Sequence, residues 1–541
     1  MKKNKFKNFK SKAAKSYNNK NFNSEDKINI GNITLAHSNQ TFILFGIIDK
    51  IFQTPGPTIF YINDGTGVLA LKSFQGPGIR AHSEIKEGDI VKVIVKIEEF
   101  RDEIEGDIIN ISVVKEDKKN LILKEIEKIE RERISIKPIN FLISNDILEK
   151  LKPFFIKAAT EIRLAIMKNR PIIIRHHNDT DGYSAGFALE KAILPLIERQ
   201  HLSIKAAWEF YTRAPCAAPF YEIDDSIRDT ANSLRNVAKF SNKMPLIIIV
   251  DNGSSPEDLL AIKQGKIHGA DFIVIDHHFF DKDMITEEVL VHINPFLVKE
   301  DGAKFSAGML CVEVARFINP EVKNIEQIAA MAGFADRVDL TNPEAVNLYL
   351  KIAEKNGYTK ELLEEISRVI DFVSSKVKFM EAREYIEVIF GEPRNKQKAL
   401  IELLAPHIKH LELKGLEIAK SCIKIEKINK ISLQYLDIEE TFPRFGFYPK
   451  PGKVIGMIHD YAKEIKKIDA LISIGMMDAA IILRATDGAN FSIHELIDFI
   501  EKKLPIAFVN GGGHKNAGSI SFVPHKKNEV LKLLKEFIKS R

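Results

Sequence analysis

The chain has 541 residues, of which 45% are hydrophobic and 28% charged, and its formal net charge is only +5. This length exceeds what one hydrophobic core supports and predicts three or four domains. No apolar run reaches the roughly 20 residues that a membrane-spanning helix needs, so we expect no such helix. No apolar stretch follows the first lysines, so we expect no signal peptide. The three cysteines lie far apart without a CxxC pair, which excludes a disulfide framework and a cysteine zinc site and indicates a cytoplasmic protein.

Residues 1–27 are expected to form a disordered basic tail. The first twenty residues contain eight lysines and no acid, interleaved with Asn and Ser. Such a tail either contacts phosphates or only keeps the protein in solution.

Residues 28–117 have the pattern of short strands joined by glycine-rich turns. The predicted strands are Thr41–Ile48, Thr58–Ile62, Val68–Leu71, Ile90–Val95 and Ile108–Val113. Five short strands in about 85 residues predict a small β-barrel. With the Asp64-Gly65-Thr66-Gly67 turn, the segment resembles the OB-folds that bind nucleic acid. Phe45, Phe60, Phe74 and Phe100 either stack on bases or pack in the barrel core.

The remaining chain is expected to contain a helical linker (118–150), an α/β domain (151–342), a helical region without a chemical motif (343–425) and a second α/β domain (426–541). Within 151–342, continuous apolar runs at 171–174, 246–250 and 272–275 suit strands of a parallel sheet buried on both faces. Each run ends in polar residues, and ligands of open α/β sheets bind at the carboxyl ends of the strands.

The first polar group is Arg175-His176-His177-Asn178-Asp179-Thr180-Asp181-Gly182. If this segment stays extended, Arg175, His177, Asp179 and Asp181 project to one side. Several acids on one face need a counter-charge, for which a divalent metal is the natural partner. The alternative is a polar loop in which Asp181 caps the following helix.

The other acids follow later elements. Asp251 comes directly after the second apolar run, and Asp276-His277-His278 follow the third. A carboxylate beside two imidazoles is a good metal-binding set, although each motif alone is also common in structural roles. Asp336 lies in a segment of small apolar residues and needs a partner, which is either a metal or the neighbouring Arg337.

Taken in order and spacing, Asp179-Thr180-Asp181-Gly182, Asp251, Asp276-His277-His278 and Asp336 resemble the four motifs of the DHH phosphoesterase superfamily. Asn510-Gly511-Gly512-Gly513-His514 and the strand ending in Arg484 resemble the accessory substrate domain of its RecJ and nanoRNase branch. The resemblance covers roughly 155–340 and 425–541. With an OB-fold ahead, the chain is most similar to archaeal RecJ-like nucleases, including the Hef-associated subtype.

The resemblance implies two divalent ions, Mn²⁺ or Mg²⁺. Asp179 and Asp251 would hold the first ion, and Asp181, Asp251, His277 and Asp336 the second. His278 would contact the scissile phosphate or assist the leaving group, and Asp276 would orient a neighbouring imidazole. Many members have a histidine where this chain has Arg175, so that His177 could take over as ligand while Arg175 binds phosphate.

For the accessory domain, the resemblance implies that Arg484, Gly511, Gly512, Gly513 and His514 bind a phosphate or a terminal nucleotide. Between the motifs, residues 208–222 contain the only tryptophan and several aromatics around Arg213. This segment either stacks a base, covers a sheet edge or forms a subunit contact.

The expected function is a metal-dependent exonuclease that hydrolyses single-stranded DNA or RNA from an end through a metal-activated water, in DNA repair or nucleic-acid turnover. By resemblance to the Hef-associated subtype, digestion in the 3′→5′ direction is expected. The alternatives are a phosphodiesterase of short RNAs or cyclic dinucleotides, a pyrophosphatase and a non-catalytic replication scaffold. Possible partners are a DNA-repair helicase or nuclease, a replisome protein or a second copy of the chain.

Overall fold

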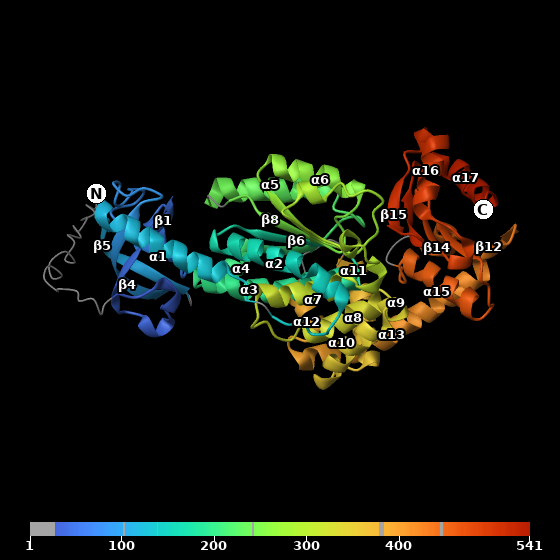
Figure 1. Ribbon diagram of the computed structural model, residues 1–541, viewed down its shortest axis with the longest axis horizontal. Helices are drawn as coiled ribbons and strands as arrows, with labels where there is room; N and C mark the ends of the chain where they lie inside the picture. The colour runs from blue at the N-terminus through green and yellow to red at the C-terminus, as the bar shows by residue number, and fades with distance from the viewer. Residues whose placement is uncertain (1–26, 101–102, 138, 241–242, 378–382, 444–446) are drawn as a thin grey trace, which may run out of the picture. The chain divides into compact units, whose positions relative to one another are not determined.

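The computed structural model describes residues 27–100, 103–137, 139–240, 243–377, 383–443 and 447–541, so the predicted basic tail lies almost entirely outside the described residues. The chain divides into two compact units (Figure 1). The first comprises Met1–Ile134 with Ile197–Ala206, and the second comprises Ser135–Leu196 with Ala207–Arg541. No helix among the described residues is long and apolar enough to cross a membrane.

The first unit is built on a closed five-stranded barrel of order β1-β2-β3-β5-β4. Its strands are β1 (Thr41–Gln53), β2 (Thr58–Asn63), β3 (Val68–Ser73), β4 (Ile90–Phe100) and β5 (Glu103–Val113). Alternate side chains point inward, and Leu44, Phe60 and Val93 are fully buried in its core. The barrel predicted from the strand pattern is therefore confirmed, with β1, β4 and β5 clearly longer than expected. Helix α1 (Glu116–Ile134) follows β5.

The second unit contains a five-stranded sheet of order β10-β9-β8-β6-β7 in which every neighbouring pair is parallel. The strands are β6 (Ile172–His176), β7 (Tyr211–Pro215), β8 (Leu246–Val250), β9 (Asp271–Ile275) and β10 (Val291–Ile293). The predicted apolar runs form β6, β8 and β9, and their residues are almost all buried because helices cover both faces.

The helices around this sheet are α2 (Asp146–Met167), α3 (Thr180–His201), α4 (Ala206–Phe210), α5 (Ile223–Phe240), α6 (Pro256–Ile267) and α7 (Ala307–Ile318). Figure 1 shows α5 and α6 on one face and α2, α3 and α7 on the other. Because all strands run in the same direction, their carboxyl ends meet at one edge, where the polar motifs follow.

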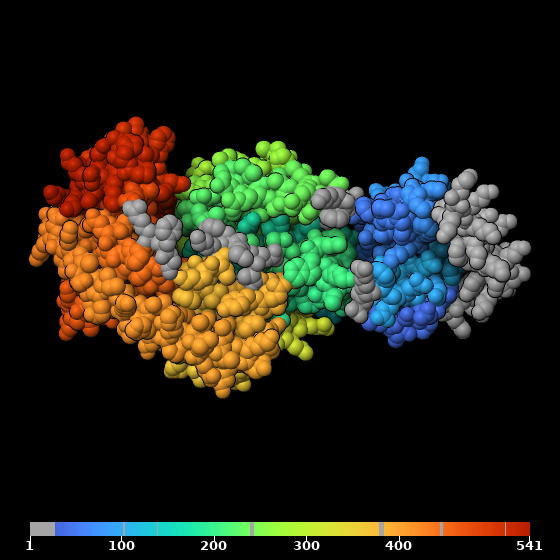
Figure 2. Space-filling model, turned by 180° about the vertical axis from the view of Figure 1, so that it is seen from behind, coloured from blue at the N-terminus to red at the C-terminus, as the bar shows by residue number. Residues whose placement is uncertain are grey.

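A helical region then leads to a second sheet. It consists of α8 (Glu326–Ala335), α9 (Val338–Thr341), α10 (Pro343–Lys355), α11 (Lys360–Val377), α12 (Arg383–Phe390) and α13 (Arg394–Cys422). These helices contribute much of the yellow and orange surface in Figure 2. They pack through apolar side chains such as Leu363, Ile370 and Ile408, which are fully buried.

The C-terminal sheet has the order β11-β12-β13-β14-β16-β15 and is mixed. Its strands are β11 (Lys424–Ile428), β12 (Ile431–Asp437), β13 (Leu471–Met476), β14 (Ala480–Ala485), β15 (Asn510–His514) and β16 (Ala517–Ser521). Its helices are α14 (Ile438–Thr441), α15 (Pro451–Glu464), α16 (Ile493–Lys503) and α17 (Lys527–Lys539). One apolar core joins the sheet to α16 and α17, and another joins it to α15. The predicted fold class, a parallel α/β domain with an accessory α/β domain and a barrel, is confirmed.

Candidate metal centre

The polar residues that follow β6, β8 and β9 converge at the carboxyl edge of the parallel sheet. Strand pairing places Val250 beside His176 on one side and beside Ile275 on the other, so the residues after each strand emerge together. Asp336 joins them from the end of α8. Four segments far apart in the sequence thus supply a single cluster of acids and imidazoles.

One group in this cluster consists of His177, Asp179 and Asp251, whose ligand atoms lie close enough to hold one ion. His177 Nδ1 lies 2.8 Å from Asp179 Oδ2 and 3.6 Å from Asp251 Oδ2. The second group surrounds His277. Its Nε2 lies 3.3 Å from Asp251 Oδ1, 3.3 Å from Asp336 Oδ2 and 4.0 Å from Asp181 Oδ2.

Asp251 belongs to both groups, because one of its carboxylate oxygens faces His177 and the other faces His277. It is almost fully buried, and its Oδ2 has no hydrogen-bond partner among the described residues. Its φ of 61° lies in the left-handed region, which is uncommon outside glycine and is typical of functional sites. A divalent cation bound to this buried carboxylate oxygen would give it the partner that it lacks among the described residues.

Burial and mutual repulsion shift the pKa values of the clustered side chains. Burial and the nearby charges of Asp251 and Asp336 raise the pKa of Asp181 well above its ordinary value. Burial also raises the pKa of Asp336. The pKa of His277 is raised well above its ordinary value, because Asp336, Asp251 and Asp181 outweigh the effect of burial. A divalent cation would neutralise this concentration of negative charge.

Asp276 plays a different part, because its oxygens already have partners. Its Oδ1 accepts hydrogen bonds from the backbone N–H of His277 at 2.8 Å and lies 2.8 Å from His278 Nδ1. Its Oδ2 accepts from the backbone N–H of Ser254 at 3.2 Å. Asp276 also raises the pKa of His278 against the effect of burial. These contacts hold the ring of His278 in place.

Backbone contacts hold the ligands in place. Asp181 accepts hydrogen bonds from the N–H groups of Ala307 and Gly308 at the start of α7, at 2.8 and 3.0 Å. His277 Nδ1 lies 3.2 Å from the carbonyl oxygen of Gly302, in the short 3₁₀-helix Gly302–Lys304. A Cβ at Gly302 would lie 1.9 Å from the His277 carbonyl oxygen, so only glycine permits this approach.

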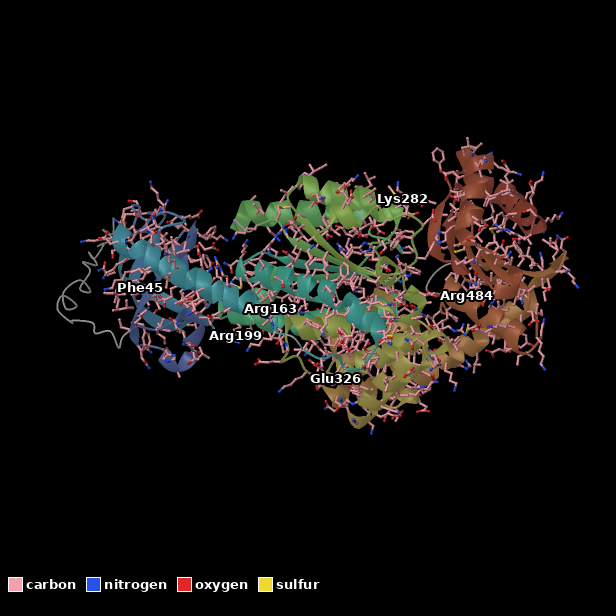
Figure 3. All side chains as sticks on the ribbon, in the orientation of Figure 1. Phe45, Arg163, Arg199, Lys282, Glu326 and Arg484 are labelled. Carbon is pink, nitrogen blue, oxygen red and sulfur yellow. The ribbon has the colours of Figure 1, made fainter. Side chains whose placement is uncertain are left out.

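A pocket of about 380 Å³ opens over the cluster within the second unit. Its lining includes the acids and imidazoles His177, Asp179, Asp276, His278 and Asp336. It also includes Arg484, Gly512 and Gly513 of the accessory sheet, as well as Phe220 and Arg337. Three of the predicted substrate-binding residues, Arg484, Gly512 and Gly513, thus line the same pocket as members of the acid cluster (Arg484 is labelled in Figure 3). Gly511 does not line the pocket, and the side chain of His514 lies outside the described residues.

The prediction that Arg175 binds phosphate is wrong. Its guanidinium is buried and donates to both carboxylate oxygens of Asp229, with Asp225 3.6 Å away. Strand β6 ends at His176, so the side chains do not alternate as far as Asp181, as the prediction had assumed. Arg175 points toward α5 rather than toward the candidate metal ligands. His177 is the residue that reaches Asp179 and Asp251.

The aromatic segment 208–222 contributes through Phe220, not through the residues around Arg213. Arg213 is buried in an ion pair with Glu190 at 2.8 Å. Trp208 is exposed and stacks on the guanidinium of Arg383. Phe220 lines the pocket, and a Cβ at Gly512 would come within 3.1 Å of its ring. Phe220 belongs to the segment for which base stacking was one of the expectations, whereas Arg337 was considered only as a partner of Asp336 and not as a residue of the pocket.

In the barrel, the four candidate phenylalanines divide by exposure. Phe60 is fully buried in the core, so its expected alternative role in stacking is excluded. Phe74 and Phe100 are 63% and 50% exposed, and the Lys72 ammonium lies 4.5 Å from the Phe100 ring centroid. Phe45, labelled in Figure 3, lies 5.7 Å from the ammonium of Lys27.

Comparison with known proteins agrees with this architecture. Residues 171–334 match the model of the DHH family, N-terminal domain. The uncharacterized protein MJ1198 of Methanocaldococcus jannaschii is 36% identical over 524 residues, covering 92% of this chain and 68% of that protein.

Two solved structures are also similar. The DHH domain of PF0399, described as a member of the s1p family of ribosomal proteins, is 38% identical with a TM-score of 0.73, over 78% of this chain and 98% of that one. The exonuclease RecJ bound to manganese is 15% identical with a TM-score of 0.49, over 74% and 96% of the two chains. The family match, the extended identity and the four converging motifs show that this chain belongs to the DHH family of phosphoesterases.

Proposed function

We propose that the protein is a metal-dependent nuclease that hydrolyses phosphodiester bonds at the end of single-stranded DNA or RNA. The observation that carries the proposal is the position of Asp251. It joins two groups of metal-ligand side chains, and three members of these groups, His177, Asp179 and Asp336, line a pocket together with Arg484, Gly512 and Gly513. A cation site and an anion-binding wall facing one cavity suit a phosphate ester.

The residues present fit two divalent ions. His177, Asp179 and Asp251 would hold one, and Asp181, Asp251, His277 and Asp336 the other. A mixed set of carboxylates and imidazoles suits Mn²⁺, and Mg²⁺ is the alternative. When bound, such ions supply a deprotonated water and neutralise charge on the attacked phosphate.

His278 is the group of this chain that would act on the substrate directly. It lines the pocket while Asp276 holds its Nδ1, so Nε2 is the ring nitrogen that would meet a phosphate oxygen. The pKa of His278 is raised by Asp276, which favours the protonated ring that donates a hydrogen bond or a proton to the leaving oxygen.

The pocket supports action at a strand end. A volume of about 380 Å³ lies near the lower limit for ligand sites, which suits a terminal nucleotide. The Phe220 ring beside Gly512 offers an apolar surface for its base. The barrel, with Phe74 and Phe100 exposed, would hold the rest of the strand, which argues for substrates longer than dinucleotides. Digestion in the 3′→5′ direction and a role beside repair or replication proteins remain part of the proposal.

The proposal is tested by digesting 5′-labelled and 3′-labelled DNA and RNA oligonucleotides in Mn²⁺. The wild-type protein should produce a ladder that shortens from one end, whereas Asp251→Asn should produce none. Asp281→Asn is a matched control, because Asp281 is exposed and belongs to none of the ligand groups. Equal cleavage by Asp251→Asn would refute the assignment, and absence of cleavage by all three proteins would favour a non-catalytic role.

A further inference from the structure

The segment that carries the candidate ligand Asp179 is held on both sides by residues from much later in the chain. On one side, Lys450 Nζ donates a hydrogen bond to the carbonyl oxygen of Asn178 at 3.0 Å. On the other side, the hydroxyl of Thr180 donates to Asp371 Oδ1 at 2.8 Å. Both chain neighbours of Asp179 therefore have a partner outside their own segment.

These partners belong to elements that supply none of the candidate metal ligands. Asp371 lies on α11 of the helical region, and Lys450 is the residue directly before α15. Lys450 Nζ also donates to the hydroxyl of Ser374 on α11, at 2.9 Å. The ammonium of Lys450 thus connects the start of α15, α11 and the backbone next to Asp179.

Further charged and polar contacts join these elements to one another. Lys453 Nζ donates to Asp371 Oδ2 at 3.4 Å and lies 3.7 Å from Oε1 of Glu412 on α13. Glu412 also accepts hydrogen bonds from Arg368 Nε at 3.0 Å and from the Tyr448 hydroxyl at 3.2 Å. Residues of α11, α13 and the start of α15 therefore form one connected network behind the ligand-bearing segment.

We propose that Lys450 and Asp371 are positioning residues for the first ion, the one that His177, Asp179 and Asp251 would hold. By fixing the chain on either side of Asp179, they set the affinity of this ligand group for metal. The inference rests on the proposed function, because it concerns one of the two ions that this function requires. It also gives a role to the helical region, which carries no chemical motif of its own.

Asp179 is the ligand that depends on such support. Its side chain is 37% exposed, whereas that of Asp251, which directly follows β8, is 2% exposed. Strand β6 ends at His176, so strand pairing does not reach Asp179. Contacts that orient a ligand from outside are worth about 10–100-fold in metal affinity.

The sign of the effect separates positioning from simple electrostatics. The ammonium of Lys450 is bonded to the backbone next to Asp179, and its positive charge would repel a cation bound there. If charge alone mattered, removal of Lys450 would strengthen binding of the first ion. A positioning role predicts the opposite, because the ligand-bearing segment loses a fixed contact.

The first experiment measures Mn²⁺ binding by titration calorimetry in two backgrounds, each of which leaves one ligand group complete. Asp336→Ala leaves the group that contains Asp179, and Asp179→Ala leaves the group around His277. Lys450→Met should weaken the remaining ion about tenfold in the Asp336→Ala background and less than about twofold in the other. Lys463→Met is the matched control, because Lys463 is exposed on the same helix α15, and it should change neither affinity.

The second experiment tests the other side of the segment with two variants of Thr180 in the Asp336→Ala background. Thr180→Val removes the hydroxyl that meets Asp371 but keeps the branched shape, whereas Thr180→Ser keeps the hydroxyl. The valine variant should weaken Mn²⁺ binding about tenfold, and the serine variant should stay within about threefold of the threonine protein. Equal losses in both variants would assign Thr180 to packing and refute the role of Asp371.

The inference is overturned if Lys450→Met weakens both ions equally, because Lys450 would then only stabilise the fold. Unchanged or tighter binding of the first ion in Lys450→Met overturns it as well. Cleavage of labelled oligonucleotides by the wild-type protein is assayed separately. If the expected binding pattern is found but Mn²⁺ supports no cleavage, the nuclease proposal fails and the positioning role stands. If cleavage is found without that pattern, the positioning role alone fails.

Discussion

His277 and Asp251 meet at the carboxyl ends of neighbouring parallel strands, with His277 Nε2 3.3 Å from Asp251 Oδ1 and both side chains almost completely buried. The register that pairs Val250 with Ile275 places them there. Because Asp251 also faces His177 with its other oxygen, this contact joins two ligand groups into one centre.

Metal affinity should rise with pH. The pKa of Asp181 is raised by burial and by Asp251, and that of His277 is raised by Asp336, Asp251 and Asp181. Protons bound to these groups compete with the metal, because each side chain must release its proton to become a ligand. For each proton that the metal displaces, the Mn²⁺ association constant should rise by a factor of about ten per pH unit.

Titration calorimetry of Mn²⁺ between pH 6 and 8, in buffers of different ionisation enthalpy, would count the released protons. An affinity that stays constant over this range would contradict the protonated state of the cluster.

Replacing His278 should affect turnover more than metal binding. His278→Gln removes the ring that lines the pocket but none of the atoms of the Asp251–His277 contact. We expect kcat to fall by about 10²-fold or more, the usual contribution of a proton donor, with Mn²⁺ affinity changed less than tenfold. Asp276→Asn should also lower kcat, because it weakens the contact that holds the His278 ring in place. A loss of Mn²⁺ affinity that accounts for the whole effect would instead make His278 a metal ligand.

Gly302→Ala should weaken metal binding although Gly302 is not itself a candidate ligand. The new Cβ would lie 1.9 Å from the His277 carbonyl oxygen, so the loop must move and the contact of His277 Nδ1 with Gly302 is lost. We expect a loss of about 1–3 kcal/mol in the free energy of unfolding and a 10–100-fold weaker affinity for Mn²⁺. Gly56→Ala is the control, because its Cβ meets nothing closer than 3.5 Å. Wild-type Mn²⁺ affinity in Gly302→Ala would show that this support is dispensable.

The exposed aromatics of the barrel should determine retention of long strands. Phe74→Ala and Phe100→Ala each remove an exposed ring, and stacking on one base is worth about 1–3 kcal/mol, or roughly tenfold or more in affinity. Filter binding of a 30-nucleotide strand should reveal the loss while both variants keep wild-type thermal stability. Phe60→Ala should do the opposite and lower stability by about 3–5 kcal/mol, because Phe60 is a core residue. Undiminished binding by the double variant Phe74→Ala/Phe100→Ala would show that these two rings do not bind the strand.

Much of the fold was predictable from local patterns. The alternation in 41–113 predicts a barrel, and the uniformly apolar runs that become β6, β8 and β9 predict a parallel sheet covered on both faces. Because the carboxyl ends of parallel strands share an edge, the meeting of His177, Asp251 and His277 followed from the sheet alone.

The errors and omissions arise where tertiary contacts decide. Arg175 was misassigned because the end of β6 at His176 cannot be read from the sequence, and its partner Asp229 lies 54 residues away. Phe220 and Arg337 line one pocket with Arg484, Gly512 and Gly513 of the accessory sheet, a meeting that depends on tertiary packing and that no local pattern encodes.

The most direct test of the central claim is the stoichiometry of Mn²⁺ binding, measured by titration calorimetry and by elemental analysis of the gel-filtered complex. Two ions per chain are expected for the wild-type protein and no tightly bound pair for Asp251→Asn, because that side chain serves both ligand groups. Asp281→Asn should bind two ions like the wild type. One ion per wild-type chain, or two ions retained in Asp251→Asn, would contradict a dinuclear centre joined by Asp251.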